Sequence, residues 1–143
     1  MSSKWSITLP VEITNLIVNP SAEYGTTGWT AGGGTLTRVA SFQRFGAYAF
    51  SYTPSATTND GTYTTVNLTS GVTYTLSGWV YQTALSAISL SFRDSSGTYL
   101  LGTVGQTTTS KWLYLSIAYT AVSTATHRLS VNKETSSSTA VVY

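Results

Sequence analysis

The stretch that decides the fold is Asn15-Leu-Ile-Val-Asn-Pro-Ser-Ala-Glu23, followed by a turn rich in Gly and Thr that leads to Trp29. Its three consecutive apolar residues, 16–18, end at Asn19-Pro20. Because Pro20 has no backbone N–H and keeps Asn19 out of the right-handed helical region, the apolar run does not continue as a helix. The chain therefore opens with a short apolar segment, two turns and an aromatic residue that begins the next segment.

Alternation of apolar and polar residues with a period of two recurs along the chain, and helical periodicity does not occur. Tyr48, Phe50 and Tyr52, for example, alternate with small residues before Pro54 ends the run. The pattern predicts strands over 5–9, 35–40, 48–52, 63–68, 72–81, 88–93, 99–104, 112–120 and 129–131, and a last strand that opens at 141. Turns rich in Gly, Ser and Asn separate them. The expected fold class is therefore all-β, an antiparallel β-sandwich of the jelly-roll type.

The composition excludes several classes of function. The 143 residues suit one domain with its own core. Charged residues make up 8% of the chain, against about 25% in typical soluble domains. The net charge is +2 and the seven Lys and Arg residues form no basic stripe, so nucleic acid is not an expected partner. The sequence has no cysteine, no signal-peptide core and no apolar run of membrane-spanning length, so neither disulfides nor membrane insertion are expected.

Four motifs in a fixed order resemble the carbohydrate-binding-module 4/9 type. After the opening at 15–29 they are Phe45-Gly-Ala-Tyr-Ala49, Gly71-Val-Thr-Tyr-Thr-Leu-Ser-Gly-Trp-Val80 and the stretch 112–121. They are spread over most of the chain, from residue 15 to residue 121. The resemblance implies a galactose-binding-like jelly roll, which recurs in bacterial glycan-degrading enzymes and in phage tail and surface proteins. It therefore implies a binding or structural module on a virion or in an extracellular setting.

The chain departs from this family at both ends. Members usually close with one more strand after the equivalent of Val141-Val142-Tyr143, whereas here a strand-like segment, 4–12, precedes the family opening. We therefore expect an N-terminal arm at 1–14 and, at 15–143, a module that lacks the closing strand. The unpaired edge would invite another strand. Three explanations are open: the chain is a fragment of a longer protein, its arm fills the gap, or one subunit lends its arm to the next in a homo-oligomer.

The parity of the expected strands selects candidate ligand-binding residues. Sugar-binding sandwiches of this type stack aromatic rings on pyranose faces and surround them with polar groups. In the stretch 72–81, Leu76 and Val80 should face the core, which leaves Trp79 and Tyr81 on the opposite face. By the same rule, residues in or next to the predicted strands 88–93, 112–120 and 129–131 also face outward. The expected glycan platform consists of Trp79, Tyr81, Arg93, Tyr114, Arg128 and Asn132.

For several of the aromatic residues a structural role competes with ligand contact. The alternative for Trp79 and Tyr81 is that they cover a sheet face or lie in a subunit interface. Trp29 and Trp112 lie at strand ends, where we expect them to cap the core. His127 is the only histidine and shares parity with the apolar residues of its strand, so we expect it in the core or an interface rather than as a catalytic base.

The acidic residues are too few and too scattered to indicate catalysis. A glycosidase needs two facing carboxylates about 5 to 9.5 Å apart, and the five acids fall in predicted turns or near the termini without signs of pairing: Glu12, Glu23, Asp60, Asp94 and Glu134. Asp60 and Asp94 are expected to cap turns. The resemblance implies one structural calcium, with Glu23 as its carboxylate ligand, although the Asp of the missing closing strand would be lost from that site. No enzyme activity and no other cofactor are expected.

Three functions are compatible with these features. The leading hypothesis is a non-catalytic module on a virion or extracellular surface that contacts glycans through an aromatic sheet face. The second is a purely structural virion protein, such as a tail, capsid-decoration or fibre subunit, that assembles through its strand edges. The third is an accessory module of a secreted glycoside hydrolase. The expected partner is accordingly a glycan, or other copies of this chain and virion proteins.

Overall fold

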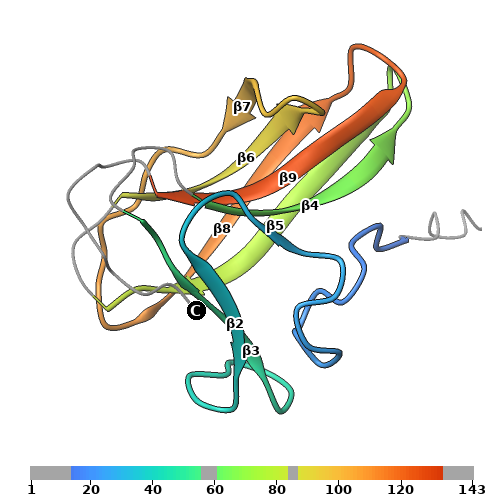
Figure 1. The fold of residues 1–143 in the computed structure, drawn as a ribbon. Coiled ribbons are helices and arrows are strands. Elements are labelled where there is room, and N and C mark those ends of the chain that lie inside the picture. The colour runs from blue at the N-terminus through green and yellow to red at the C-terminus, as the bar shows by residue number, and fades with distance from the viewer. Residues whose placement is uncertain (1–13, 56–60, 84–86, 134–143) are drawn as a thin grey trace, which may run out of the picture.

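The described part of the chain consists of strands and loops. The computed structural model describes residues 14–55, 61–83 and 87–133, which contain nine strands and no helix (Figure 1). Hence none of these residues belongs to a helix with the length and hydropathy needed to cross a membrane. The strands are β1 Thr30–Ala31, β2 Thr35–Val39, β3 Ala49–Thr53, β4 Gly61–Leu68, β5 Thr73–Tyr81, β6 Ile88–Asp94, β7 Tyr99–Gly102, β8 Trp112–Thr120 and β9 Ala125–Lys133.

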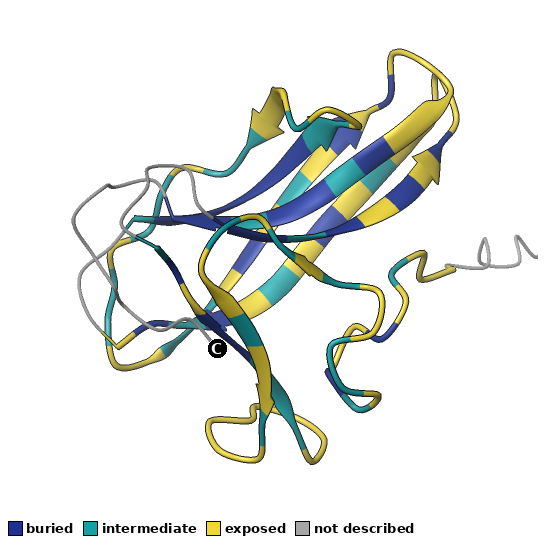
Figure 2. Cartoon of the chain, in the orientation of Figure 1, coloured by how far each residue is buried: buried dark blue, intermediate teal, exposed yellow. Residues whose placement is uncertain are grey.

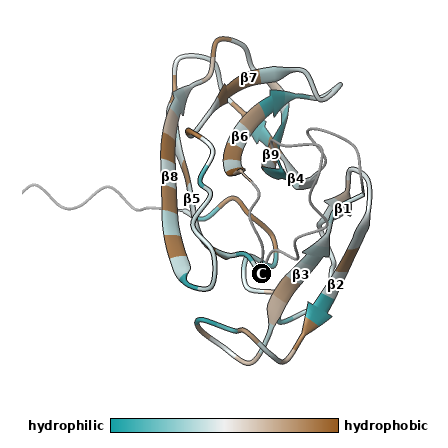
Figure 3. Cartoon of the chain, turned by 90° about the vertical axis from the view of Figure 1, so that its left-hand side faces the viewer, coloured by the Kyte–Doolittle hydropathy of each residue, from teal (hydrophilic) through white to brown (hydrophobic). Residues whose placement is uncertain are grey.

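All pairs of neighbouring strands are antiparallel. The strands β1, β4, β9, β6 and β7 form a five-stranded sheet in that order, while β5 pairs with β8 and β2 with β3. The β5–β8 pair faces β6 and β9, so that the two sheets stack as the layers of a sandwich, and the β2–β3 hairpin lies beside them (Figure 3). The prediction of an all-β antiparallel sandwich is confirmed.

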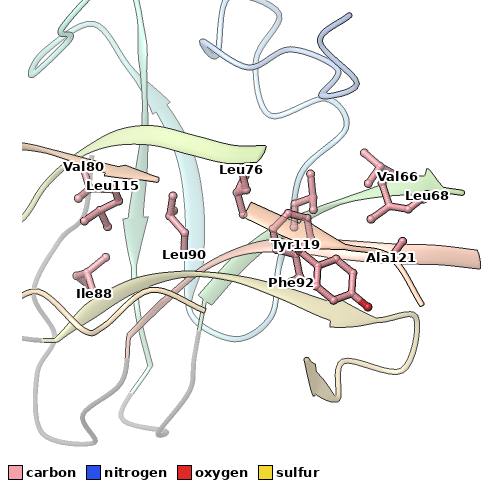
Figure 4. Close-up of a cluster of buried hydrophobic side chains, with 11 residues drawn as sticks. Val66, Leu68, Leu76, Val80, Ile88, Leu90, Phe92, Leu115, Tyr119 and Ala121 are labelled. Atoms are coloured by element: carbon pink, nitrogen blue, oxygen red, sulfur yellow. The ribbon is translucent and has the colours of Figure 1, made fainter. Parts of the chain in front are cut away.

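The hydrophobic core lies between the β5–β8 pair and the five-stranded sheet. Phe92 of β6 and Tyr119 of β8 meet across the two layers, with ring centroids 4.9 Å apart (Figure 4). His127 is 3% exposed and its ring centroid lies 5.9 Å from that of Tyr119, so it is part of the interior, as predicted. The buried apolar cluster comprises Val66, Leu68, Leu76, Val80, Ile88, Leu90, Phe92, Leu115, Tyr119, Ala121 and Leu129.

The opening loop is organised by Asn19. This residue is buried and has a φ of 53°, in the left-handed region that Asn tolerates better than most residues. Its Nδ2 donates to the backbone oxygens of Gly25 and Thr27, and its Oδ1 accepts from the Tyr24 N–H. Its own backbone oxygen accepts from Nε1 of Trp29 at 3.1 Å. The motif that predicted the fold is therefore a closed loop that fixes the position of Trp29.

A large groove separates the β2–β3 hairpin from β5. Within the described residues, β3 pairs only with β2 and β5 only with β8, so each strand presents one unpaired edge. The groove has a volume of about 1010 Å³, and its lining includes Ile17, Phe50, Leu76 and Val131. Residues 1–13 and 134–143 lie outside the described part of the chain. The predictions of an N-terminal arm and of a missing closing strand therefore stay predictions.

Candidate functional site

The outer face of the five-stranded sheet carries a small polar pocket. Ser89, Ser91 and Asn132 point away from the core and are nevertheless buried. Most of β6 is covered on both of its faces, as its largely dark ribbon shows (Figure 2). The pocket has a volume of about 100 Å³ and is lined by Gly32, Gly61, Tyr63, Arg93, Gly97, Arg128, Ser130 and Asn132.

Two tyrosines and two arginines follow one another across this face. Tyr63 belongs to β4, Arg128 to β9, Arg93 to β6 and Tyr99 to β7, which is the order of the strands in the sheet. The guanidinium carbon of Arg128 lies 4.6 Å from the centroid of the Tyr63 ring, and that of Arg93 lies 5.8 Å from the centroid of the Tyr99 ring. These distances are typical of cation–π contacts. The four residues, named the Tyr–Arg row below, combine two aromatic rings with two planar sets of N–H donors.

Neighbouring polar groups hold the arginines in place. Nη1 of Arg93 donates to the backbone oxygen of Gly97 at 3.0 Å, and its Nε donates to Oγ of Ser91 at 3.3 Å. Nδ2 of Asn132 donates to the same hydroxyl oxygen at 2.5 Å. A Cβ atom on Gly97, whose φ is +100°, would lie 2.9 Å from Nη1 of Arg128. Both guanidinium groups therefore reach the same turn, and only glycine suits that position.

Asp94 shapes the turn between β6 and β7. Its Oδ1 accepts from the backbone N–H groups of Ser96 and Thr98, at 2.9 and 2.8 Å, and from the Ser96 hydroxyl at 2.6 Å. The hydrogen bond from the Ser96 side chain is the main reason why the pKa of Asp94 falls from 3.8 to about 2. Asp94 thus stays ionised and caps the turn that carries Gly97, as predicted.

The structure divides the six predicted platform residues between two sheets. Three of them line the polar pocket: Arg93, Arg128 and Asn132. The other three lie on the outer face of the β5–β8 pair: Trp79, Tyr81 and Tyr114. The predicted parity is correct for both groups, but their assignment to one platform is wrong, because β5 and β8 are not part of the five-stranded sheet. Contact between any of the six and a ligand stays a prediction.

The aromatic residues of the β5–β8 pair contact one another rather than forming a flat surface. The Trp79 and Tyr114 rings lie 5.2 Å apart at an interplanar angle of 53°. The guanidinium carbon of Arg44 lies 3.8 Å from the centroid of the Trp79 ring and so occupies one of its faces. We call this group the outer aromatic cluster; it consists of Phe42, Arg44, Trp79, Tyr81, Trp112 and Tyr114.

The sequence analysis does not select the two tyrosines of the Tyr–Arg row as candidate ligand-binding residues. Parity could have identified Tyr63, because in the predicted strand 63–68 it is out of phase with the inward-facing Val66 and Leu68. Tyr99 lies beside a register shift between β6 and β7 at Phe92 and Arg93, and alternation alone does not reveal such a shift.

Comparison with known protein families identifies the family of the chain. Residues 14–139 match the family model of the carbohydrate-binding module 4/9 type, described as a carbohydrate binding domain. The chain belongs to this family. The resemblance seen in the four sequence motifs is thereby confirmed. No curated protein matches the chain.

Solved structures similar to this carbohydrate-binding domain share its jelly-roll fold. A family 16 carbohydrate-binding module has 26% identity and a TM-score of 0.69, and the match covers 90% of this chain and 94% of that one. The CBM22-1–GH10 modules of Clostridium thermocellum xylanase 10B, complexed with xylohexaose, have 22% identity and a TM-score of 0.69, over 88% of this chain and 26% of that one. The enzymatically active domain of bacteriophage CBA120 tailspike protein 4 has 17% identity and a TM-score of 0.59. This match covers 90% of this chain and 20% of that one.

The carboxylate of Glu23, the predicted calcium ligand of this carbohydrate-binding domain, contacts backbone N–H groups. Its Oε1 accepts from Ala47 at 3.0 Å and from Tyr48 at 3.4 Å, and the Glu23 backbone oxygen accepts from Nη1 of Arg38. A calcium ion takes six to eight oxygen ligands. Among the described residues, no three of His, Asp or Glu lie close enough together to hold a metal ion. Calcium binding at Glu23 stays a prediction.

Proposed function

We propose that the chain is a non-catalytic module that binds glycans on the outer face of its five-stranded sheet, at the Tyr–Arg row. The observation that carries this proposal is the Arg128–Tyr63 stack at the rim of a polar pocket. This stack places an aromatic ring next to N–H donors that point in a fixed direction.

The chemistry of this face suits a sugar. A pyranose ring has an apolar C–H surface that packs on an aromatic ring, and hydroxyl groups that need fixed donors and acceptors. Tyr63 and Tyr99 supply the rings, and the guanidinium groups supply donors in a planar fork. Ser130 and Asn132, which line the same pocket, add hydroxyl and amide groups. Family membership supports the same class of ligand.

The outer aromatic cluster is a weaker candidate for the same role. Arg44 covers one face of Trp79 just as Arg128 covers one face of Tyr63, so this contact does not separate the two sites; the difference is that no polar pocket adjoins Trp79 among the described residues. Tyr114 is tilted by 53° against Trp79, so that the two rings do not form a common plane. We therefore assign this cluster a structural role, in which its rings and the stacked guanidinium cover the outer side of β5 and β8.

The carboxylates support a non-catalytic role. Glycosidases act with two carboxyl groups that face each other across the scissile bond. Of the described acids, Glu23 accepts from backbone N–H groups beside β3, whereas Asp94 accepts from the turn after β6. Both carboxylates thus serve local structure, and neither lines the polar pocket.

The setting we propose is extracellular, on a virion surface or beside the catalytic domain of a secreted glycoside hydrolase. The similarity to one module of a xylanase supports the second setting, and the similarity to a tailspike domain supports the first. A structural role through strand edges is the alternative function. The observation that favours it is the groove between β3 and β5, each of which has one edge that no other described strand pairs with.

A glycan array probed with the wild-type chain and with Arg128→Gln tests the proposal. We expect the wild type to retain at least one class of glycan and the variant to lose it. Arg44→Gln is the matched control, because it removes the same charge from the outer aromatic cluster. Absence of glycan binding in the wild type, together with a defined oligomer in light scattering, would overturn the proposal in favour of the structural alternative.

A further inference from the structure

The two arginines of the Tyr–Arg row are direct cross-strand partners. In the β6–β9 register, Arg93 pairs with Arg128. Both side chains line the polar pocket and reach the turn at Gly97, where one donates to the backbone oxygen and the other lies against the glycine. Like charges in directly opposed positions of an antiparallel sheet destabilise the sheet. The arginine pair therefore lowers the stability of the sheet, and folding alone gives no reason for it.

No described carboxylate lines the pocket that the two arginines share. Asp94 follows Arg93 directly, but its Oδ1 is engaged by the turn at Ser96 and Thr98. Glu23 accepts from the backbone N–H of Ala47, beside the β2–β3 hairpin. The other three acids of the chain, Glu12, Asp60 and Glu134, lie outside the described residues.

We infer that the Arg93–Arg128 pair selects an acidic glycan, whose carboxylate or sulfate group lies between the two guanidinium groups. This inference rests on the proposed function and names its ligand class. Guanidinium groups match carboxylate and sulfate oxygens with two parallel hydrogen bonds, and charge-assisted bonds of this kind are stronger than those to a hydroxyl. The anion would also remove the repulsion between the two cations. Tyr63 and Tyr99, on the flanking strands, then contact the neighbouring parts of the sugar chain.

The test compares polymers that share a sugar backbone and carry either charged or uncharged substituents. Polygalacturonate is compared with fully methyl-esterified pectin, and dextran sulfate with dextran, by affinity electrophoresis of the wild-type chain. We expect the charged member of at least one pair to bind at least about tenfold more tightly, with the preference falling as salt is added. The carboxylate and sulfate pairs together distinguish the two sources of the anion.

Arg93→Gln and Arg44→Gln separate a local effect from net charge, because each lowers the formal net charge by one. We expect Arg93→Gln to lose the preference for the charged polymer and Arg44→Gln to keep it. Equal loss in both variants would overturn the inference, since a nonspecific charge effect would explain it. Equal binding of charged and neutral polymers would also overturn it while leaving the proposed function intact. If no glycan binds at all, the proposed function fails as well.

A second readout needs no ligand. Repulsion between two partly exposed cations is screened by salt, so the melting temperature of the wild type should rise with ionic strength. The same rise should be smaller in Arg93→Gln and unchanged in Arg44→Gln. An identical salt dependence in all three proteins would mean that the cationic pair carries no cost, which would overturn the reasoning on which the inference rests.

Discussion

The guanidinium of Arg128 on β9 lies over the ring of Tyr63 on β4, with 4.6 Å between the guanidinium carbon and the ring centroid. The contact joins two neighbouring strands on their outer face, away from the hydrophobic core. Because the guanidinium of Arg128 packs on the tyrosine ring, the N–H groups of Arg128 point in a fixed direction before any ligand binds. Preorganised donors of this kind lose less entropy on binding than freely rotating side chains do.

Replacing Tyr63 by Ala should lower glycan affinity about tenfold, because both the ring and the support for Arg128 are lost. Tyr63→Phe keeps the ring and should bind like the wild type. Isothermal titration with the glycan identified on the array measures both variants. If Tyr63→Ala binds as tightly as the wild type, the ligand does not contact this end of the Tyr–Arg row.

Replacing Trp79 by Ala should instead lower stability. The substitution removes the stack with Arg44 and the ring contact with Tyr114, which together are worth about 1 to 2 kcal/mol of unfolding free energy. Urea denaturation measures this loss, and titration of the variant should give an unchanged glycan affinity. A stable Trp79→Ala protein that no longer binds glycan would move the binding site to the outer aromatic cluster.

Asn19→Ala should be among the more costly single substitutions in the loops. It removes three hydrogen bonds of a buried side chain and places Ala at a φ of 53°, for a total of about 3 kcal/mol of unfolding free energy. Asn67 is the matched control, since its exposed side chain accepts one bond, from the Thr126 hydroxyl. Asn67→Ala should cost less than about 1 kcal/mol. Equal losses in the two variants would contradict the organising role of Asn19.

The turn at Asp94 should weaken in acid. Its carboxyl has a folded-state pKa of about 2, below the ordinary value of 3.8, so the stabilisation is present above pH 3.8 and is lost as the pH falls through about 2. Asp94→Asn cannot supply an ionised acceptor. The difference in urea midpoint between wild type and variant should therefore be constant above that window and shrink within it. A difference that does not change with pH would mean that the charge of Asp94 has no role in the turn.

Much of the fold could be predicted from the sequence because alternation reports directly on burial in a two-layered sandwich. The strand 72–81 was predicted from its pattern, and its inward residues Leu76 and Val80 are in the core. The structure extends the short strand predicted at 129–131 to Ala125–Lys133. Residues 126–128 are polar, and the pairing of this strand with β4 determines their conformation, which the local sequence does not encode.

The site was harder to predict, because parity gives the face of a strand but not the sheet to which the strand belongs. Trp79 and Arg93 both point outward, yet β5 and β6 lie in different sheets. The Arg93–Arg128 pair depends on the register between β6 and β9, which are far apart in sequence. Nor does the sequence indicate that Arg44, in the loop after β2, covers the ring of Trp79.

The most direct test of glycan binding at the Tyr–Arg row is to map the bound glycan on the chain by NMR. The isotope-labelled wild-type chain is titrated with the array ligand, and the amide shifts are followed together with the indole N–H signals. We expect the largest shifts in β4, β6 and β9, around Tyr63, Arg93 and Arg128, and an unchanged Trp79 indole. Shifts confined to Trp79 and the other residues of β5 and β8 would contradict a binding site on the five-stranded sheet.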